Sequence, residues 1–196
     1  MPQHIQDKHS VYLKSTLRDI MSCCSDETCT PIRVITILEA VYPTFKTFEF
    51  YFMVVRILFS CPVVDSEVLC YLIECCPRLL EFRDAEQKTL LHCLVIGSTS
   101  STSAIEKAIK QKPSLVSQVC SSGDTPLRLL LKQPLPDSAV AKLLIDADPS
   151  ALFQRNDAGD LPIHELLRAC KWHGCHGGAL ECLRLLLRVC LLCVET

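Results

Sequence analysis

A tetrapeptide that occurs three times decides the fold: Thr89-Leu90-Leu91-His92, Thr125-Pro126-Leu127-Arg128 and Leu161-Pro162-Ile163-His164. Consecutive copies lie 36 residues apart. A proline precedes each copy by 12 residues, at Pro77, Pro113 and Pro149, so a second landmark keeps the same spacing. Two landmarks in one register over three copies indicate an internal repeat, and periods of about 20–50 residues are typical of stacked structural modules.

The residues at these landmarks predict two helices in each module. Thr or Asp before the Pro-Leu step supplies a side-chain oxygen for the helix N-cap, and proline fits the first helical position. Gly123 and Gly159 permit the positive φ of a tight turn. The later proline of each module ends the second helix, because the residue before a proline avoids the α region, and an extended turn then follows. Second helices are predicted within residues 67–75, 103–110 and 138–149.

Three stretches carry a resemblance to a known family: Gly123-Asp124-Thr125-Pro126-Leu127, Gly159-Asp160-Leu161-Pro162-Ile163-His164 and Leu143-Leu144-Ile145-Asp146-Ala147-Asp148-Pro149. They resemble the ankyrin repeat, in which a Thr-Pro-Leu-His tetrapeptide opens the first helix. The resemblance extends from residue 67 to about residue 168. It implies a scaffold that binds protein, without implying a particular partner.

The sequence departs from the ankyrin pattern in three ways. Its period is 36 residues, whereas ankyrin repeats usually have about 33. A Pro-Ser-Leu or Pro-Ser-Ala step replaces the usual Gly-rich exit of the module. Larger side chains stand where ankyrin repeats have a pair of alanines, at Leu94-Val95, Leu130-Leu131 and Leu166-Leu167. We therefore expect wider helix spacing and a divergent subtype.

The predicted fold is all-α, an ankyrin-like helical repeat solenoid with short extended turns between modules. Residues 1–30 are predicted to form an N-terminal helical cap, with its helix over residues 10–22, and a linker. Residues 31–196 are predicted to form the repeat array. Its modules are a degenerate one at 31–83, two regular ones at about 84–119 and 120–155, and a lengthened last one at 156–196. Each module buries its apolar face by stacking on its neighbours.

Composition and charge argue against several classes of protein. Hydrophobic residues make up 49% of the chain, and the net charge is −2 with no basic run longer than a pair, so we expect no nucleic-acid partner. The polar N-terminus lacks the apolar core of a secretion signal. The apolar stretch 48–64 contains Glu49, Arg56 and Pro62, which favours buried core over a membrane span. Fourteen cysteines without an export signal favour free thiols and a cytoplasmic or nuclear location.

Binding of another protein is the predicted function. A solenoid presents its turn tips and the inner face of its first helices as one continuous surface. The candidate partner-binding residues are Glu86, Gln87, Lys88, Ser121, Ser122, Asp124, Arg128, Asn156, Asp157 and Asp160, together with Trp172, the only tryptophan. The identity of the partner does not follow from these residues.

Catalysis is not predicted. The sequence contains no Gly-rich phosphate loop, no nucleophile elbow and no paired-carboxylate arrangement. His92 and His164 stand at the fourth position of the tetrapeptide, where Arg128 stands in the middle copy. Because a catalytic histidine would not be exchanged for arginine, we interpret both histidines as structural groups that hydrogen-bond neighbouring turns. No cofactor is expected.

A Cys/His-rich segment supports an alternative function. Leu144 should recur at position 180, but its best match is near Leu186, so about six residues are inserted and a loop is predicted over 170–178. This loop contains Cys170, His173, Cys175 and His176, which are the ligand types that zinc prefers. Four ligands within seven residues would strain a tetrahedral site. The alternatives are a metal- or redox-responsive regulatory protein and a plain flexible Gly-rich loop.

The last helix, predicted over residues 179–193, is apolar on most of its circumference. Its polar residues Glu181, Arg184 and Arg188 form one narrow stripe. A helix with so little polar surface normally has neighbours on two sides, and large exposed apolar patches often mark contacts. Its outer face is therefore predicted either to dock a partner or a second copy of the chain, or to be a frayed or truncated end.

Overall fold

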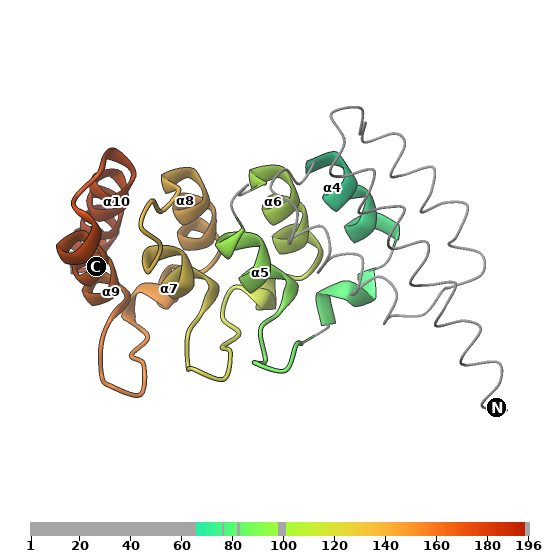
Figure 1. Cartoon of the computed structure of the whole chain (residues 1–196), viewed down its shortest axis with the longest axis horizontal. Helices are drawn as coiled ribbons and strands as arrows, with labels where there is room; N and C mark the ends of the chain where they lie inside the picture. The colour runs from blue at the N-terminus through green and yellow to red at the C-terminus, as the bar shows by residue number, and fades with distance from the viewer. Residues whose placement is uncertain (1–65, 76, 82, 98–100, 195–196) are drawn as a thin grey trace, which may run out of the picture. The chain divides into compact units, whose positions relative to one another are not determined.

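The computed structural model describes residues 66–75, 77–81, 83–97 and 101–194. Over these residues the prediction of an all-α fold is confirmed, with seven α-helices, three short 3-10 helices and no strand (Figure 1). The predicted N-terminal cap and linker, the stretch 48–64 and the upstream part of the degenerate module lie outside the described residues. The described residues fall into two units, divided between Leu79 and Leu80.

The first unit contains α4, Ser66–Cys75, which confirms the helix predicted over residues 67–75. A 3-10 helix, η1 at Pro77–Glu81, follows directly and crosses the boundary to the second unit. The buried residues of α4 follow one another at spacings of three and one residues, which places them on one face of the helix. They are Leu69, Leu72 and Ile73.

The second unit consists of three pairs of helices. The pairs are α5 (Leu90–Ile96) with α6 (Thr102–Gln111), α7 (Pro126–Leu131) with α8 (Ser138–Ala147), and α9 (Pro162–His173) with α10 (Gly177–Val194). The first helices, α5, α7 and α9, pack in one row, and the second helices, α6, α8 and α10, pack in another (Figure 1). Each pair therefore packs on the next. None of the described helices is both long and apolar enough to cross a bilayer.

The predicted N-caps are confirmed in two of the three tetrapeptides. The Oγ1 atoms of Thr89 and Thr125 accept the backbone N–H three residues later, at 3.5 and 3.3 Å. In the third copy the prediction that Asp160 caps the helix is wrong, because the N-cap position belongs to Leu161. There the Nδ1 atom of His164 accepts the N–H of Leu161 at 3.0 Å. The N–H of His164, which a cap would accept, instead donates to the carbonyl of Leu161 at 3.0 Å.

The prolines that end the second helices also begin short 3-10 helices, which the sequence analysis did not predict. These are η1, η2 at Pro113–Leu115 and η3 at Pro149–Phe153. Proline fits the first position because its φ is preset and a first-turn N–H has no partner inside the helix. The residue two positions after each proline is buried and anchors the 3-10 helix; these residues are Leu79, Leu115 and Ala151.

The last module differs from its prediction. The sequence predicts an inserted loop over residues 170–178, but α9 continues to His173 and only residues 174–176 connect it to α10. No glycine or proline lies between Pro162 and Gly174, so nothing stops the helix earlier. Gly174 then ends it with φ of +85°. Trp172 and Cys170 therefore belong to a helix, and the inserted residues lengthen the last two helices.

Candidate functional site

The turns at residues 84–88, 120–124 and 156–160 have the same backbone hydrogen bonds. In each turn the fourth residue donates its N–H to the carbonyl of the first, at 2.8 to 3.0 Å, and the first donates to the carbonyl of the fifth at 3.0 Å. A turn of this kind requires positive φ at its fourth residue. Gly123 and Gly159 adopt it as predicted, and Gln87 adopts it as well, with φ of +58°.

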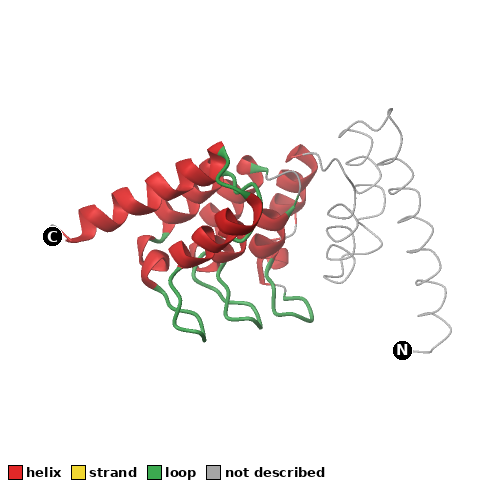
Figure 2. Cartoon of the chain, turned by 60° about the vertical axis from the view of Figure 1, so that its left-hand side comes forward, coloured by secondary structure: helices red, strands yellow, loops and turns green. Residues whose placement is uncertain are grey.

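Hydrogen bonds also join the first turn to the second, and join the helices α5 and α7 to the turn of the following module. The N–H of Ser121 donates to the carbonyl of Glu86 at 2.8 Å. The Nε2 atom of His92 lies 3.1 Å from the carbonyl oxygen of Asp124, and Arg128 donates to the carbonyl of Asp160. These last two bonds span the same 32 residues in consecutive modules. The three turns consequently project from one side of the second unit (Figure 2).

Most of the predicted partner-binding residues lie along this row of turns. Five of them are exposed, namely Glu86, Gln87, Ser121, Ser122 and Asp157, and three are half-buried, namely Lys88, Asn156 and Asp160. We call these eight residues the turn edge. Trp172 is 77% exposed but lies about ten residues along α9, which corresponds to about 15 Å at the rise of an α-helix. It is therefore separate from the turn edge.

Asp124 and Arg128 are not part of the exposed surface, contrary to the sequence analysis. Asp124 is buried and pairs with the Nζ atom of Lys132 at 2.8 Å, while Ser122 donates to its Oδ2 atom at 2.7 Å. Arg128 is 1% exposed. Its guanidinium donates to the carbonyl oxygens of Gln154 and Asp160 and forms an ion pair with Glu165 at 3.3 Å. Both side chains hold the fold together internally.

Glu165 is the buried counter-charge of this network, and the sequence analysis missed it. Its carboxylate also accepts Nη1 of Arg168 at 3.0 Å and Nδ2 of Asn156 at 3.2 Å. A buried charge is tolerated when it is paired and hydrogen-bonded. The hydrogen bond from Arg168 also keeps the pKa of Asp160 below its usual range. The acidic and basic groups at the third turn thus neutralise each other.

The predicted hydrogen bond from His92 to a neighbouring turn is confirmed. Its Nδ1 atom faces the backbone N–H of Thr89 at 3.1 Å, and this N–H can only donate. Its Nε2 atom faces a carbonyl, which can only accept, so Nε2 carries the proton and the ring is neutral. Burial accordingly lowers the pKa of His92 below its ordinary value of 6.5. His164 also accepts the N–H of Leu161 at its Nδ1 atom, but its side chain is 46% exposed.

The Cys/His segment brings two of its four residues together. The Sγ atoms of Cys170 and Cys175 are 3.0 Å apart, and this hydrogen bond, together with burial, raises the pKa of Cys170 to about 11. The Nε2 atom of His176 instead lies 2.9 Å from the carbonyl oxygen of His173. Within the described residues, no three His, Cys, Asp or Glu side chains are grouped so that they could hold a metal ion. The segment therefore pairs two thiols but does not gather its four predicted ligands around one point.

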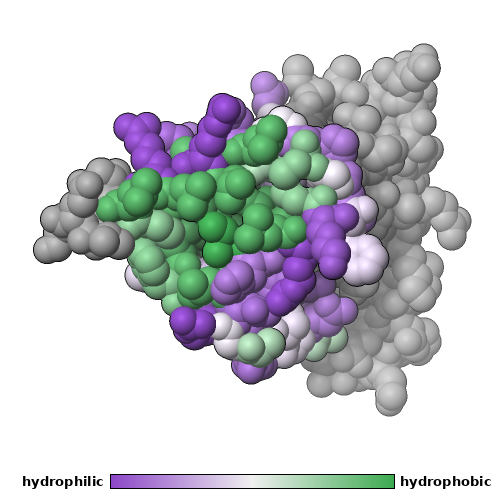
Figure 3. Space-filling model, turned by 90° about the vertical axis from the view of Figure 1, so that its left-hand side faces the viewer, coloured by the Kyte–Doolittle hydropathy of each residue, from purple (hydrophilic) through white to green (hydrophobic). Residues whose placement is uncertain are grey.

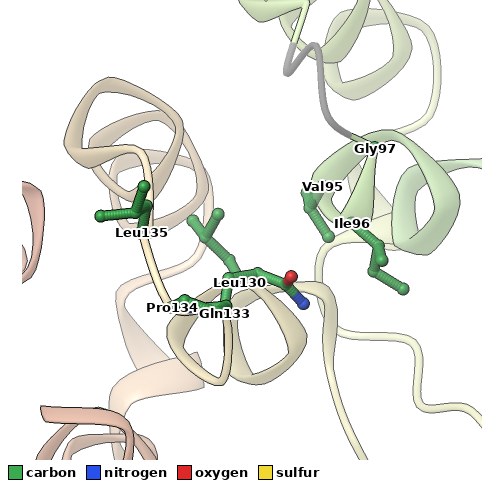
Figure 4. A pocket seen from close by; sticks show the side chains of 7 residues that line it. All are labelled: Val95, Ile96, Gly97, Leu130, Gln133, Pro134 and Leu135. Atoms are coloured by element: carbon green, nitrogen blue, oxygen red, sulfur yellow. The ribbon is translucent and has the colours of Figure 1, made fainter. Parts of the chain in front are cut away.

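A small cleft of about 280 Å³ lies between the end of α5 and the loop after α7 (Figure 4). The side chains that line it are apolar apart from that of Gln133, whose amide donates to the carbonyl of Leu129 at 3.1 Å. The other lining residues are Val95, Ile96, Gly97, Leu130, Pro134 and Leu135. The cleft gathers no ionisable side chain, so it offers hydrophobic contact and no acid–base chemistry.

The outward side of the last helix pair is apolar (Figure 3). We call it the end face and define it by Leu167 of α9 and by Leu180, Leu183, Leu187 and Leu191 of α10. Four of these leucines are exposed and Leu183 is half-buried. The sequence pattern predicts the α10 part of this face but not Leu167. The repeat register contains the missing signal, because Leu167 lies 36 residues after the buried Leu131.

None of the protein-family models, curated proteins or solved structures compared with this chain matches it. The resemblance to ankyrin repeats therefore rests on the residues of the sequence itself.

Proposed function

We propose that the chain is a non-catalytic protein-interaction scaffold, an array of divergent ankyrin-like modules that binds a protein partner along its turn edge. The observation that carries this proposal is the common construction of the three turns. Each has the same two backbone hydrogen bonds, and the second and third turns each accept a bond from a side chain of the preceding module's first helix. A repeated, internally bonded turn with exposed tips is the surface that stacked modules present to partners.

The order of the turn edge favours binding. Association becomes weaker when loops and side chains must be immobilised in the complex, and a surface that is already ordered avoids much of that cost. The turn backbones are held before any partner arrives, while Glu86, Ser122 and Asp157 remain exposed. Among the described residues, the buried side chains of His92, Asp124, Arg128 and Glu165 all have partners inside the chain. Their roles are structural, which agrees with a scaffold.

Affinity capture with charge-reversed variants tests the proposal. The test variant combines Glu86→Arg and Asp157→Arg on the turn edge. The matched control combines Glu106→Arg on α6 and Asp146→Arg on α8, which removes equally exposed acidic groups from the other row of helices. Mass spectrometry of the captured proteins is expected to identify a partner that the test variant loses at least about tenfold, as expected for loss of roughly 1.4 kcal/mol of binding energy. Equal capture by both variants would contradict the proposal.

A second candidate function, redox regulation, is favoured by the 3.0 Å separation of the Cys170 and Cys175 sulfur atoms. Two thiols at this distance need only a small approach to form a bond of about 2.05 Å. A small-molecule disulfide such as oxidised glutathione would accept the two electrons: the Cys170–Cys175 bond forms, and two molecules of glutathione thiol are released. Oxidation followed by peptide mass mapping checks this step. Retention of both free thiols in a glutathione buffer that oxidises exposed dithiols would exclude it.

A further inference from the structure

We infer that the end face binds an amphipathic helix of another protein, whose apolar stripe is flanked by acidic side chains. This inference rests on the proposed scaffold function, because it names a class of partner for a second surface of the same array. Three observations carry it: the positions that lie uncovered, the heptad-like spacing of the leucines on α10, and the charges that border them.

The first observation is a comparison of equivalent positions in consecutive modules. Val95 and Leu131 are 1% and 0% exposed, whereas Leu167, at the same position of the last module, is 49% exposed. In the second helices, Ile145 is 3% exposed and its counterpart Leu187 is 46% exposed. The earlier positions belong to helix pairs on which another pair packs. Among the described residues, no further helix pair packs on α9 and α10. Positions that are buried in the earlier modules are therefore exposed in the last one.

The second observation concerns the shape of the seat. Leu180, Leu183 and Leu187 follow one another at spacings of three and four residues, and Leu191 follows four residues later. This spacing forms the seam of paired helices, in which side chains of one helix fit between those of the other. Leu191 stands where the register places the proline that ends α8, and α10 therefore continues to Val194. The apolar stripe from Leu180 to Leu191 is about 18 Å long at the rise of an α-helix, which suits a partner helix that makes contact over about three turns.

The third observation is the charge around the seat. Arg184, Arg188 and Lys171 are exposed beside the apolar stripe. Glu181 is the acidic residue of this border on α10, and it already pairs with Arg184 at 2.6 Å. Within the described part of the chain, Arg188 and Lys171 take part in no ion pair. A partner helix with acidic flanks would complement these cations, and charges at the border of an interface set specificity and association rate.

The same charges disfavour a second copy of the chain as the occupant. Pairing two end faces would bring four arginines of α10 into one interface with only two glutamates. Like charges placed opposite each other weaken an interface. The face therefore selects an acidic helix over its own copy.

A binding measurement with synthetic helical peptides tests the inference. The probe is a fluorescent 21-residue peptide with leucine at the heptad seam positions and glutamate at the flanking positions. The comparison peptide has lysine in place of each glutamate. We expect the full chain to raise the fluorescence anisotropy of the glutamate peptide and to bind the lysine peptide at least tenfold more weakly. Equal affinity for the two peptides would overturn the inference.

Variants of the chain locate the binding. Leu187→Glu on the end face is expected to weaken binding of the glutamate peptide at least tenfold. Leu135→Glu is the matched control, because Leu135 is an even more exposed leucine in the loop after α7. The double change Arg184→Glu with Arg188→Glu is expected to reverse the preference between the two peptides. Unchanged binding by Leu187→Glu, in a variant whose circular dichroism matches the parent chain, would refute the end face as the seat.

Two further measurements separate the possible failures. The turn-edge variant Glu86→Arg with Asp157→Arg is expected to bind the glutamate peptide normally, so loss of the end-face result alone leaves the scaffold proposal intact. Sedimentation velocity of the chain by itself is expected to give no dimer that depends on Leu187. A dimer that Leu187→Glu dissociates would assign the end face to a second copy and overturn the inference.

Discussion

At the scale of single residues, the fourth position of the tetrapeptide links one module to the next. His92 and Arg128 both reach a carbonyl 32 residues further along the chain, although one is a neutral ring and the other a cation. Arg128 needs a buried counter-charge, which Glu165 supplies at 3.3 Å. A histidine and an arginine thus bond to equivalent carbonyls in consecutive modules. Each of them is expected to affect the stability of the fold in its own way.

Replacing Arg128 tests this connection. Arg128→Leu is expected to lower the free energy of unfolding by about 3 kcal/mol, the lower end for breaking a buried pair, because Glu165 keeps its bonds to Arg168 and Asn156. Arg128→His is expected to lose less than half as much, because histidine makes the equivalent bond at position 92. Urea denaturation measures both. Equal losses of stability in Arg128→Leu and Arg128→His would show that the bond from residue 128 to the carbonyl of Asp160 contributes nothing to stability.

Neutral His92 predicts a dependence of stability on pH. Burial lowers the pKa of folded His92, so the unfolded chain takes up a proton near pH 6.5 that the folded chain takes up only at lower pH. Unfolding therefore binds a proton in this window, and stability falls as the pH falls below 6.5, by up to roughly 1.4 kcal/mol per pH unit. His92→Gln should flatten the profile between pH 6.5 and 5. Parallel profiles for the two proteins would contradict the assignment.

At the scale of secondary-structure elements, the signals that the sequence predicted correctly are local ones. The N-caps at Thr89 and Thr125, the stops at Pro113 and Pro149 and the positive φ of Gly123 depend on neighbours within a few residues. The burial of Arg128 was not predictable in this way, because it depends on carbonyls 26 and 32 residues away. The 3-10 helices were not predicted, because a proline was interpreted only as the end of the preceding helix. Proline also fits the first position of a following helical turn.

The start of α10 was mispredicted for a related reason. Gly177 and Gly178 suggested a flexible loop, yet both belong to the helix. A Cβ atom on Gly178 would lie 2.6 Å from the carbonyl oxygen of Pro136, whereas one on Gly177 would meet nothing within 4 Å. Gly178 therefore allows α10 to pack close to the segment before α8, which is a requirement of tertiary packing that sequence patterns do not reveal.

The two glycines form a matched pair for a stability measurement. Gly178→Ala is expected to destabilise the protein by about 1–3 kcal/mol, since the backbone must shift to relieve the contact. Gly177→Ala is expected to cause no loss, because alanine favours a helix and has room there. Thermal or urea unfolding of the two variants checks this. A loss at Gly177 equal to that at Gly178 would disprove the close approach.

At the scale of the whole molecule, the sequence predicted the positions of the three turns better than it predicted which of their residues are exposed. The 36-residue register located the three turns, and the structure adds that all three have the same backbone hydrogen bonds. Of the predicted surface residues, Asp124 and Arg128 are buried, and the apolar end of the second unit extends beyond α10 to Leu167. Which residues remain exposed depends on how helix pairs pack on each other, so it becomes visible only in three dimensions.

Site-specific photo-crosslinking from the turn edge tests the central claim most directly. A photoreactive amino acid at Ser122, which is exposed at the tip of the middle turn, is compared with the same amino acid at Lys142 on α8, whose side chain is 62% exposed in the other row of helices. Irradiation in a cell extract from the source of the protein is expected to yield a discrete protein adduct at position 122 and none at position 142. The same pattern of adducts at both positions, or no adduct at either, would contradict binding along the turn edge.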